Sequence, residues 1–166
     1  MNFNELLKNI TKKNINIGIV GMGYVGLPLA KSFVQKGAKV YGFDIDKKKI
    51  DKLRIGKSYI NYFKNNEIKE MIKKDFIPTT NFTFINKMDL IILCLPTPIK
   101  KNKSPEMLYI LNSMRMIFPY LKKYQTLSLE STTYPGTCEE IIAPILKKKF
   151  NIGKNFFLIY SPERED

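Results

Sequence analysis

Three glycines near the N-terminus limit the possible folds of this 166-residue chain more than any other residues do. An apolar run at residues 17–20 leads into Gly21-x-Gly23-x-x-Gly26, and an apolar helical pattern follows. This order predicts a strand, a tight turn and a helix that bind a dinucleotide. Gly21 would permit the turn, Gly23 would let a pyrophosphate approach the backbone, and Gly26 would let the helix pack close to the strand. The N–H groups of the helix N-terminus would bind the phosphates, whereas a glycine-rich turn without a ligand is the alternative.

An acidic residue stands at the end of the next predicted strand. Residues 39–44 favour a strand, and Asp44 lies about 20 residues after the glycines, where a dinucleotide fold places a carboxylate. The carboxylate would accept hydrogen bonds from the adenosine ribose hydroxyls. Its charge would repel a 2′-phosphate, which favours NAD over NADP. Asp44 as the N-cap of a helix from Ile45 is an alternative that is compatible with ribose binding.

Three lysines follow Asp44 closely. Lys47, Lys48 and Lys49 would favour a 2′-phosphate if they faced the cofactor, but at helical spacing they more simply cover a solvated face. Lys49 is retained as a candidate cofactor-binding residue.

The rest of the chain alternates between strand-like and helix-like segments. The clearest strand pattern, at residues 89–95, is apolar on both faces, as a central parallel strand covered by helices must be. We expect strands at residues 15–20, 39–44, 76–80, 89–95, 126–130 and 156–160, with helices at 24–36, 45–54, 57–74, 106–118 and 137–149. Gly37 would end the first helix, Ser104-Pro105-Glu106 would begin the fourth, and Thr137 with Glu140 would form a capping box for the last.

This alternation predicts an α/β fold of a single domain. We expect a doubly wound, six-stranded parallel sheet of the Rossmann type, in the strand order 3-2-1-4-5-6, with helices on both faces. Residues 15–166 would form this NAD-binding domain, and residues 1–14 would form a polar tail or a short helix.

Composition argues against several classes of function. The net charge is +13, but the lysines are spread along the chain without an aromatic–basic motif, so we expect no nucleic-acid partner. The longest apolar run, at residues 90–95, is too short to span a bilayer, and residues 1–14 lack the apolar core of a signal peptide, so we expect no membrane partner. Cys94 and Cys138 have no metal or disulfide spacing; Cys94 is expected to be a packing residue, and no metal is expected. These features favour a cytoplasmic protein, and the absence of histidine leaves proton transfer to carboxylates, lysines, hydroxyls or water.

The unusual polar segments fall where the predicted strands end. They are residues 21–26, Asp44, residues 96–98, residues 130–133 and residues 161–166. In a doubly wound sheet, ligands bind beyond the carboxyl ends of the strands, where the strand order reverses. We therefore expect these segments to meet around one ligand.

At the same segments the sequence resembles the nucleotide-sugar 6-dehydrogenases, the family of UDP-glucose and UDP-N-acetylglucosamine 6-dehydrogenases. The Thr-Thr-Tyr-Pro-Gly form is similar to the branch that acts on UDP-N-acetyl-hexosamines. The resemblance implies oxidation of a sugar C6 hydroxyl to a carboxylate in two hydride transfers, with NAD as cofactor and a UDP-sugar as substrate. The segments that carry it are Gly21-Met-Gly-Tyr-Val-Gly-Leu-Pro28, Phe43-Asp44, Cys94-Leu-Pro-Thr-Pro98, Glu130-Ser-Thr-Thr-Tyr-Pro-Gly-Thr137 and Ser161-Pro-Glu-Arg164.

The resemblance also implies roles for single residues. The glycine loop would hold the pyrophosphate and Asp44 the ribose, and Thr132 and Glu163 would face the reacting centre, with Glu163 as the acid/base for a water in the second step. From the residues alone, Thr132 is a strand end and Glu163 the first-turn acid of a helix. The implied cofactor-binding residues are Gly21, Met22, Gly23, Tyr24, Val25, Gly26, Asp44, Pro96, Thr97, Pro98, Ser131, Thr132 and Thr133.

The sequence departs from the family pattern after the Ser-Pro-Glu-Arg segment. The family has a long central helix and a substrate domain with a nucleophilic cysteine there, and we expect neither in this chain. Cys138 does not match that nucleophile, and Glu165 stands where related sequences carry an apolar residue. We therefore expect the chain alone to bind NAD without oxidising a UDP-sugar, with its oligomeric state open. A non-catalytic NAD-binding module is one alternative; half of another NAD-dependent hydroxyacid dehydrogenase is a second, against which residues 130–137 argue.

Overall fold

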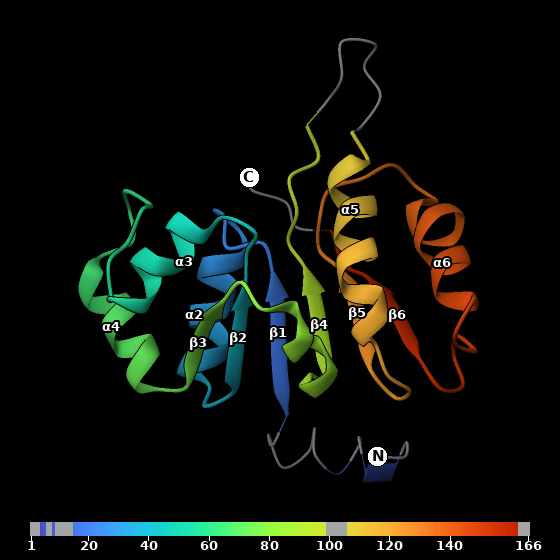
Figure 1. Ribbon diagram of the computed structural model, residues 1–166, viewed down its shortest axis with the longest axis horizontal. Coiled ribbons are helices and arrows are strands. Elements are labelled where there is room, and N and C mark those ends of the chain that lie inside the picture. The colour runs from blue at the N-terminus through green and yellow to red at the C-terminus, as the bar shows by residue number, and fades with distance from the viewer. Residues whose placement is uncertain (1–3, 6–7, 9–14, 99–105, 163–166) are drawn as a thin grey trace.

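The sheet has the strand order that the sequence pattern predicts. In the computed structural model, which describes residues 4–5, 8, 15–98 and 106–162, parallel strands lie in the order β3-β2-β1-β4-β5-β6 (Figure 1). Each strand is slightly shorter than predicted. Their bounds are β1 (Asn16–Val20), β2 (Lys39–Phe43), β3 (Phe76–Thr79), β4 (Leu90–Leu93), β5 (Thr126–Leu129) and β6 (Phe157–Tyr160).

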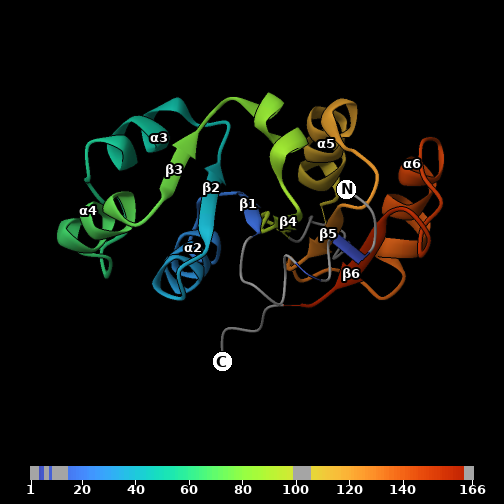
Figure 2. The ribbon, with the colours of Figure 1, turned by 90° about the horizontal axis from the view of Figure 1, so that it is seen from below.

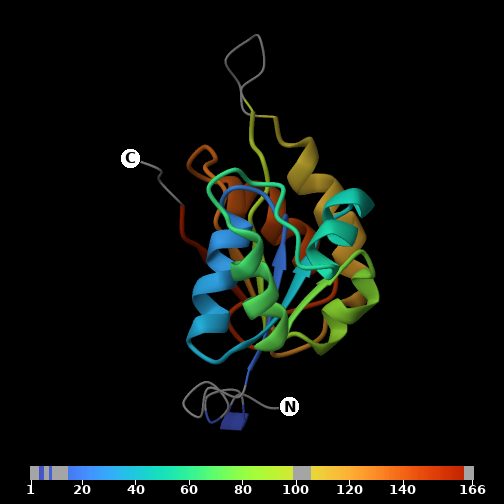
Figure 3. The same ribbon diagram turned by 90° about the vertical axis from the view of Figure 1, so that its left-hand side faces the viewer.

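The strand order reverses between β1 and β4. β1 pairs with β2 on one side and with β4 on the other, so that Gly18 lies between Tyr41 and Ile91. The chain builds one half of the sheet through β3 and then returns to the centre at β4, which opens a crevice at the carboxyl ends of β1 and β4. Figure 3 shows the strands in side view, with their carboxyl ends directed to one edge.

Helices and shorter helical turns connect the strands. The α-helices are α2 (Gly26–Gln35), α3 (Lys47–Arg54), α4 (Asn65–Lys73), α5 (Leu108–Ile117) and α6 (Ala143–Lys147). Between residues 15 and 162 the structure also describes two short 3-10 helices, η1 (Phe82–Lys87) and η2 (Phe118–Tyr120), and a π-helical turn, η3 (Cys138–Ile142). α2 and α5 lie on opposite faces of the sheet (Figure 2). Among residues 4–5, 8, 15–98 and 106–162, no helix combines the length and the apolar character that a membrane span requires.

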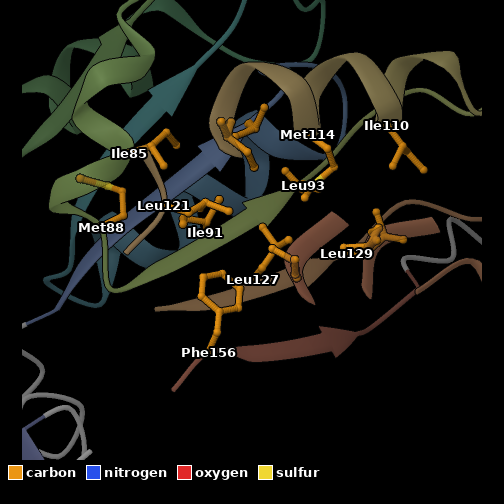
Figure 4. Close-up of a cluster of buried hydrophobic side chains, with 14 of the residues drawn as sticks. Ile85, Met88, Ile91, Leu93, Ile110, Met114, Leu121, Leu127, Leu129 and Phe156 are labelled. Atoms are coloured by element: carbon orange, nitrogen blue, oxygen red, sulfur yellow. The ribbon is translucent and has the colours of Figure 1, made fainter. Parts of the chain in front are cut away.

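Each face of the sheet has its own apolar core. On one face, Ile17 and Ile19 of β1 are buried with Leu27 and Ala30 of α2. On the other face, shown in Figure 4, Leu127 and Leu129 of β5 pack in one cluster with residues of α5. A side chain of this size contributes about 1.5–3 kcal/mol when it is fully buried.

One stripe of α5 is buried against the sheet. Ile110, Met114 and Ile117 are fully buried and follow helical spacing. The stripe beside these residues, which holds Tyr109, Asn112, Ser113 and Met116, is only partly covered or exposed.

All five α-helices begin later than predicted, and the largest difference is at α4, which begins at Asn65 because residues 57–64 are irregular. α3 begins at Lys47, because the Asp46 carboxylate caps it by accepting hydrogen bonds from the N–H groups of Lys48 (2.8 Å) and Lys49 (3.4 Å). Asp44 is therefore not the N-cap. α5 begins at Leu108, whose N–H donates to the Glu106 carboxylate; Ser104 and Pro105 lie outside the described residues.

The capping box predicted for Thr137 and Glu140 is wrong. The Thr137 hydroxyl donates to the Tyr134 carbonyl instead (2.8 Å), and Glu140 accepts a hydrogen bond from the Tyr134 hydroxyl (3.0 Å). A π-helical turn follows Thr137 before α6 begins. Gly37, by contrast, ends α2 as predicted, with φ 84° and its N–H donated to Val34. Of residues 1–14, the structure describes 4, 5 and 8, which are helical.

Candidate functional site

A cavity of about 700 Å³ opens at the carboxyl edge of the sheet, at the reversal of strand order. The loop after β1, the ends of β2, β4 and β5, and one face of α5 form its walls. Its volume is in the range of cofactor sites. Its lining residues are Val20, Gly21, Gly23, Tyr24, Val25, Asp44, Ile45, Asp46, Lys49, Phe82, Cys94, Leu95, Pro96, Thr97, Tyr109, Asn112, Ser113, Met116, Ser131 and Thr132.

The three loop glycines are required for different physical reasons. Gly21 has φ 98°, and a Cβ there would lie 2.2 Å from the carbonyl oxygen of Cys94. A Cβ at Gly26 would lie 1.9 Å from the carbonyl oxygen of Gly21, so this glycine allows α2 to approach the loop itself. A Cβ at Gly23 would meet no atom of the described residues within 4 Å. The packing of the described residues therefore does not require a glycine at position 23. This fits a position that is kept open for a ligand.

Within the described part of the chain, no side chain caps the N-terminus of α2. Its N-cap residue, Val25, makes no side-chain hydrogen bond to the helix, and the first turn contains no acidic residue. The first N–H groups of a helix have no partner within the helix, and they carry a partial positive charge. The wall formed by residues 23–25 is therefore suited to an anion such as a pyrophosphate.

Asp44 is held directly beside the glycine loop. Its side chain is largely buried, and its two oxygens accept hydrogen bonds from the N–H groups of Met22 (3.0 Å) and Asp46 (2.9 Å). The Lys49 ammonium lies 3.7 Å from the carboxylate. A carboxylate has about four acceptor positions, so Asp44 can still accept hydrogen bonds from the two hydroxyls of a ribose.

A tyrosine packs behind this carboxylate. The hydroxyl of Tyr59 donates to the Met22 carbonyl, and the Lys49 ammonium lies over its ring, 5.8 Å from the centroid. Burial raises the pKa of the Tyr59 phenol above its ordinary value, and the charges of Asp44 and Asp46 raise it further. The phenol therefore stays protonated, and remains a hydrogen-bond donor, well above neutral pH.

The far end of the cavity is formed where β4 and β5 end. The N–H of Leu95 donates to the Ser131 hydroxyl (2.9 Å), which links the two strand ends. The Thr97 hydroxyl donates to the Thr132 carbonyl (2.5 Å) and links the two following loops. These bonds hold one rim of the cavity in place.

The structure brings most of the sequence-predicted residues together in this cavity. Gly21, Gly23, Tyr24, Val25, Asp44, Lys49, Pro96, Thr97, Ser131 and Thr132 all line it. Met22 and Gly26 are buried beneath the loop, and the Met22 N–H is already donated to Asp44. Pro98 and Thr133 are not among the lining residues; the Thr133 and Tyr160 hydroxyls lie 3.4 Å apart. Glu163 lies outside the described residues.

Residues that the sequence analysis missed form another wall. Tyr109, Asn112, Ser113 and Met116 line the cavity from α5. They recur at helical spacing on the flank of α5 beside the buried stripe of Ile110, Met114 and Ile117, and this spacing could have identified them. Phe82 of η1 lines the same region.

Neither cysteine resembles an activated thiol. Cys94 lies at the end of β4 and is largely buried, as expected of a packing residue. Cys138 is also largely buried, and burial followed by the nearby Glu139 raises the pKa of its thiol. Because the thiolate is the reactive form, Cys138 is a poor nucleophile. The described part of the chain holds no cluster of residues suited to a metal ion.

Comparison with known proteins agrees with this geometry. Residues 15–166 match the UDP-glucose/GDP-mannose dehydrogenase family, NAD binding domain. Protein CapL of Staphylococcus aureus is 41% identical over 155 residues, which cover 91% of this chain and 35% of that protein. The UDP-N-acetyl-D-glucosamine 6-dehydrogenase of Pseudomonas aeruginosa is 38% identical over 156 residues, which cover 92% of this chain and 36% of that enzyme.

A solved structure shows the same likeness. A structure of the UDP-N-acetyl-mannosamine dehydrogenase Cap5O from S. aureus matches with a TM-score of 0.83 at 30% identity, covering 90% of this chain and 36% of that one. The chain thus spans about a third of the length of the curated relatives that it matches.

Proposed function

The chain belongs to the UDP-glucose/GDP-mannose dehydrogenase family, as that family's NAD-binding domain, and from this we propose that its cavity holds NAD for the oxidation of a UDP-N-acetyl-hexosamine at C6. The observation that carries the proposal is one continuous cavity. It joins the uncapped start of α2 to the Asp44 carboxylate and to the ends of β4 and β5. In a dinucleotide a central pyrophosphate joins two ribose–base units, so its site needs an anion site with a ribose acceptor beside it and a place for a base at each end.

The described residues fit each part of NAD. The N–H groups at residues 23–25 would bind the pyrophosphate, and Asp44 would accept the adenosine ribose hydroxyls. Ile45, Phe82 and Met116 offer an apolar wall for the adenine. The nicotinamide would then lie toward Thr97 and Thr132.

Two acidic side chains support NAD over NADP. The carboxylates of Asp44 and Asp46 both line the cavity where a 2′-phosphate would enter. The Asp46 carboxylate already caps α3, so the N-terminus of that helix is not free for a phosphate. Lys49 offsets part of the negative charge, but its ammonium is drawn to Asp44.

The substrate class rests on the relatives. Two of them are named for UDP-N-acetyl-D-glucosamine and UDP-N-acetyl-mannosamine, which share the nucleotide and the N-acetyl group. When bound, NAD accepts a hydride from the sugar carbon that is oxidised. Thr132 would position the reacting group, and Glu163 would take up or return a proton as the acid/base of the hydrolytic step. Neither cysteine of this chain is suited to capture an aldehyde, so we expect residues 1–166 alone to bind NAD without turnover.

The test is a chimera. Residues 1–166 replace the matching third of the P. aeruginosa enzyme, and NADH absorbance is followed with UDP-N-acetylglucosamine, UDP-N-acetylmannosamine and UDP-glucose. We expect the chimera to reduce NAD with an N-acetylated sugar and the isolated chain to produce no NADH. Glu163→Gln should lower the rate of NADH formation by the chimera. A folded chimera that binds NAD and the sugar but transfers no hydride would contradict the proposal.

A cytoplasmic location completes the proposal. It is supported by Cys94 and Cys138, which are buried and form no disulfide, as a reducing compartment favours. Fractionation of the source cells with an antibody against residues 15–166 tests it.

A further inference from the structure

We propose that Tyr59 and Tyr62 are positioning residues that aim the N–H groups of the glycine loop at the cofactor. This inference rests on the proposed placement of NAD in the cavity. Both tyrosines come from the irregular connection between α3 and α4, and neither lines the cavity. They act from the outer side of the loop.

Each tyrosine donates a hydrogen bond to one carbonyl of the loop. The Tyr59 hydroxyl donates to the Met22 carbonyl, and the Tyr62 hydroxyl donates to the Tyr24 carbonyl at 3.1 Å. The rings of Tyr24 and Tyr62 also pack together, with centroids 6.0 Å apart. Two alternate carbonyls of the loop are thus bound by one neighbouring segment.

The peptide bond converts these contacts into a direction for the N–H groups. In a trans peptide the carbonyl and the following N–H point to opposite sides of the chain, and the described residues contain no cis peptide. A Met22 carbonyl held toward Tyr59 therefore turns the Gly23 N–H away from Tyr59. A Tyr24 carbonyl held toward Tyr62 likewise turns the Val25 N–H away from Tyr62. Gly23 and Val25 are lining residues, so both N–H groups are turned to the cavity side.

The remaining bonds of the loop leave these donors available. The Gly21 N–H donates to Phe43 (2.8 Å), the Met22 N–H to Asp44 (3.0 Å), and the Gly23 carbonyl accepts from Leu27 (3.1 Å). Within the described part of the chain, the N–H groups of Gly23 and Val25 donate to no protein acceptor. A loop rich in glycine has wide conformational freedom, and the two tyrosines restrict it before the ligand arrives.

The two tyrosines differ in exposure, which provides two independent variants. Tyr59 is half-buried, whereas the Tyr62 side chain is 59% exposed. Tyr62→Phe therefore leaves the core untouched. Tyr41→Phe is the matched control, because Tyr41 stacks against Phe43 on β2 and its hydroxyl contacts neither loop carbonyl.

The experiment compares ligands with and without a pyrophosphate. Dissociation constants for NAD, ADP-ribose and adenosine are measured by titration on the wild-type chain and on the three variants. We expect Tyr59→Phe to weaken ADP-ribose binding about tenfold and Tyr62→Phe to weaken it about threefold. These are the effects expected when one hydrogen bond that orders a site is lost. Adenosine binding should stay unchanged in both variants, and Tyr41→Phe should match wild type with every ligand.

The outcomes separate this inference from the proposed function. The dissociation constant of NAD for the wild-type chain tests the proposed function. The ratio of the variant and wild-type dissociation constants tests the role of the tyrosines. Equal ADP-ribose affinity in wild type, Tyr59→Phe and Tyr62→Phe would overturn the inference while the cofactor site stands. An equal loss of adenosine and ADP-ribose would also overturn it, because a general disturbance of the domain predicts that result. A wild-type chain that binds no ADP-ribose would overturn both.

Discussion

Replacing Gly23 with alanine separates cofactor binding from folding. A Cβ at this position would meet no atom of residues 15–98 or 106–162 within 4 Å, and the φ angle of Gly23 is not positive. The unliganded domain should therefore accept the methyl group, and its free energy of unfolding should rise by about 0.4–1 kcal/mol, because the unfolded chain loses conformational freedom. The same methyl would lie against the bound pyrophosphate. Overpacking in the complex should cost about 1–3 kcal/mol, which weakens NAD binding about 5- to 150-fold.

Gly26→Ala should behave in the opposite way. A Cβ at Gly26 would lie 1.9 Å from the carbonyl oxygen of Gly21 and 3.1 Å from its carbonyl carbon. These are backbone atoms, so the loop must move to relieve the overlap. We expect a loss of about 3 kcal/mol or more in the free energy of unfolding, at the upper end of overpacking costs.

Urea denaturation and calorimetric titration with NAD, done on wild type and both variants, measure the two quantities independently. Gly23→Ala should be folded and defective in binding, whereas Gly26→Ala should be destabilised even without ligand. If Gly23→Ala binds NAD as tightly as wild type, the pyrophosphate does not lie where we place it. If Gly26→Ala is as stable as wild type, the close approach of α2 to the loop is not required.

Two further predictions concern the groups around the loop. Asp44→Asn should weaken NAD binding by about 1.5–3 kcal/mol, because a charged acceptor is lost, and should reduce the preference for NAD over NADP. Calorimetric titration with both cofactors tests this. An unchanged preference would contradict the role of Asp44. Because burial raises the pKa of Tyr59 in the folded state, its contribution to stability should be fully present below about pH 10, where the unfolded phenol ionises, and should be lost as the pH rises further. Urea denaturation from neutral to alkaline pH should show a smaller decline for Tyr59→Phe than for wild type, and identical declines would refute the assignment.

The strands and their order could be predicted because buried parallel strands read as short apolar runs. β4, with Ile91, Ile92 and Leu93 buried, is the clearest case. Its neighbours follow from the doubly wound topology, in which each crossover is right-handed and the order reverses once. The glycine spacing and Asp44 located the cavity for the same reason: the carboxyl ends of parallel strands meet at one edge.

Helix starts could not be placed as well, since they depend on which side chain reaches a free N–H. Asp44 and Asp46 are both plausible caps by composition, and only the folded geometry assigns the cap to Asp46 and the loop contact to Asp44. Thr137 fits the capping-box spacing, yet its hydroxyl bonds to Tyr134. Such choices are decided by local geometry that spacing does not encode.

The missed residues of the site share another cause. Tyr109 and Met116 lie on a helix whose buried stripe dominated its pattern, so the stripe beside it was not recognised. Tyr59 and Tyr62 lie in residues 57–64, which were predicted to be helical but are irregular, and tertiary packing brings them to the glycine loop. The catalytic role of Glu163 stays a prediction.

The most direct measurement of the central claim is a ¹H–¹⁵N spectrum of residues 1–166 recorded during titration with NAD. If the cavity is the cofactor site, saturable shifts should appear at the amides of Gly23, Tyr24 and Val25, at Asp44 and near Thr97 and Thr132. Amides on the far edge of the sheet, such as Lys39 and Lys123, should not move. No saturable shifts, or shifts confined to residues outside the cavity, would contradict the account.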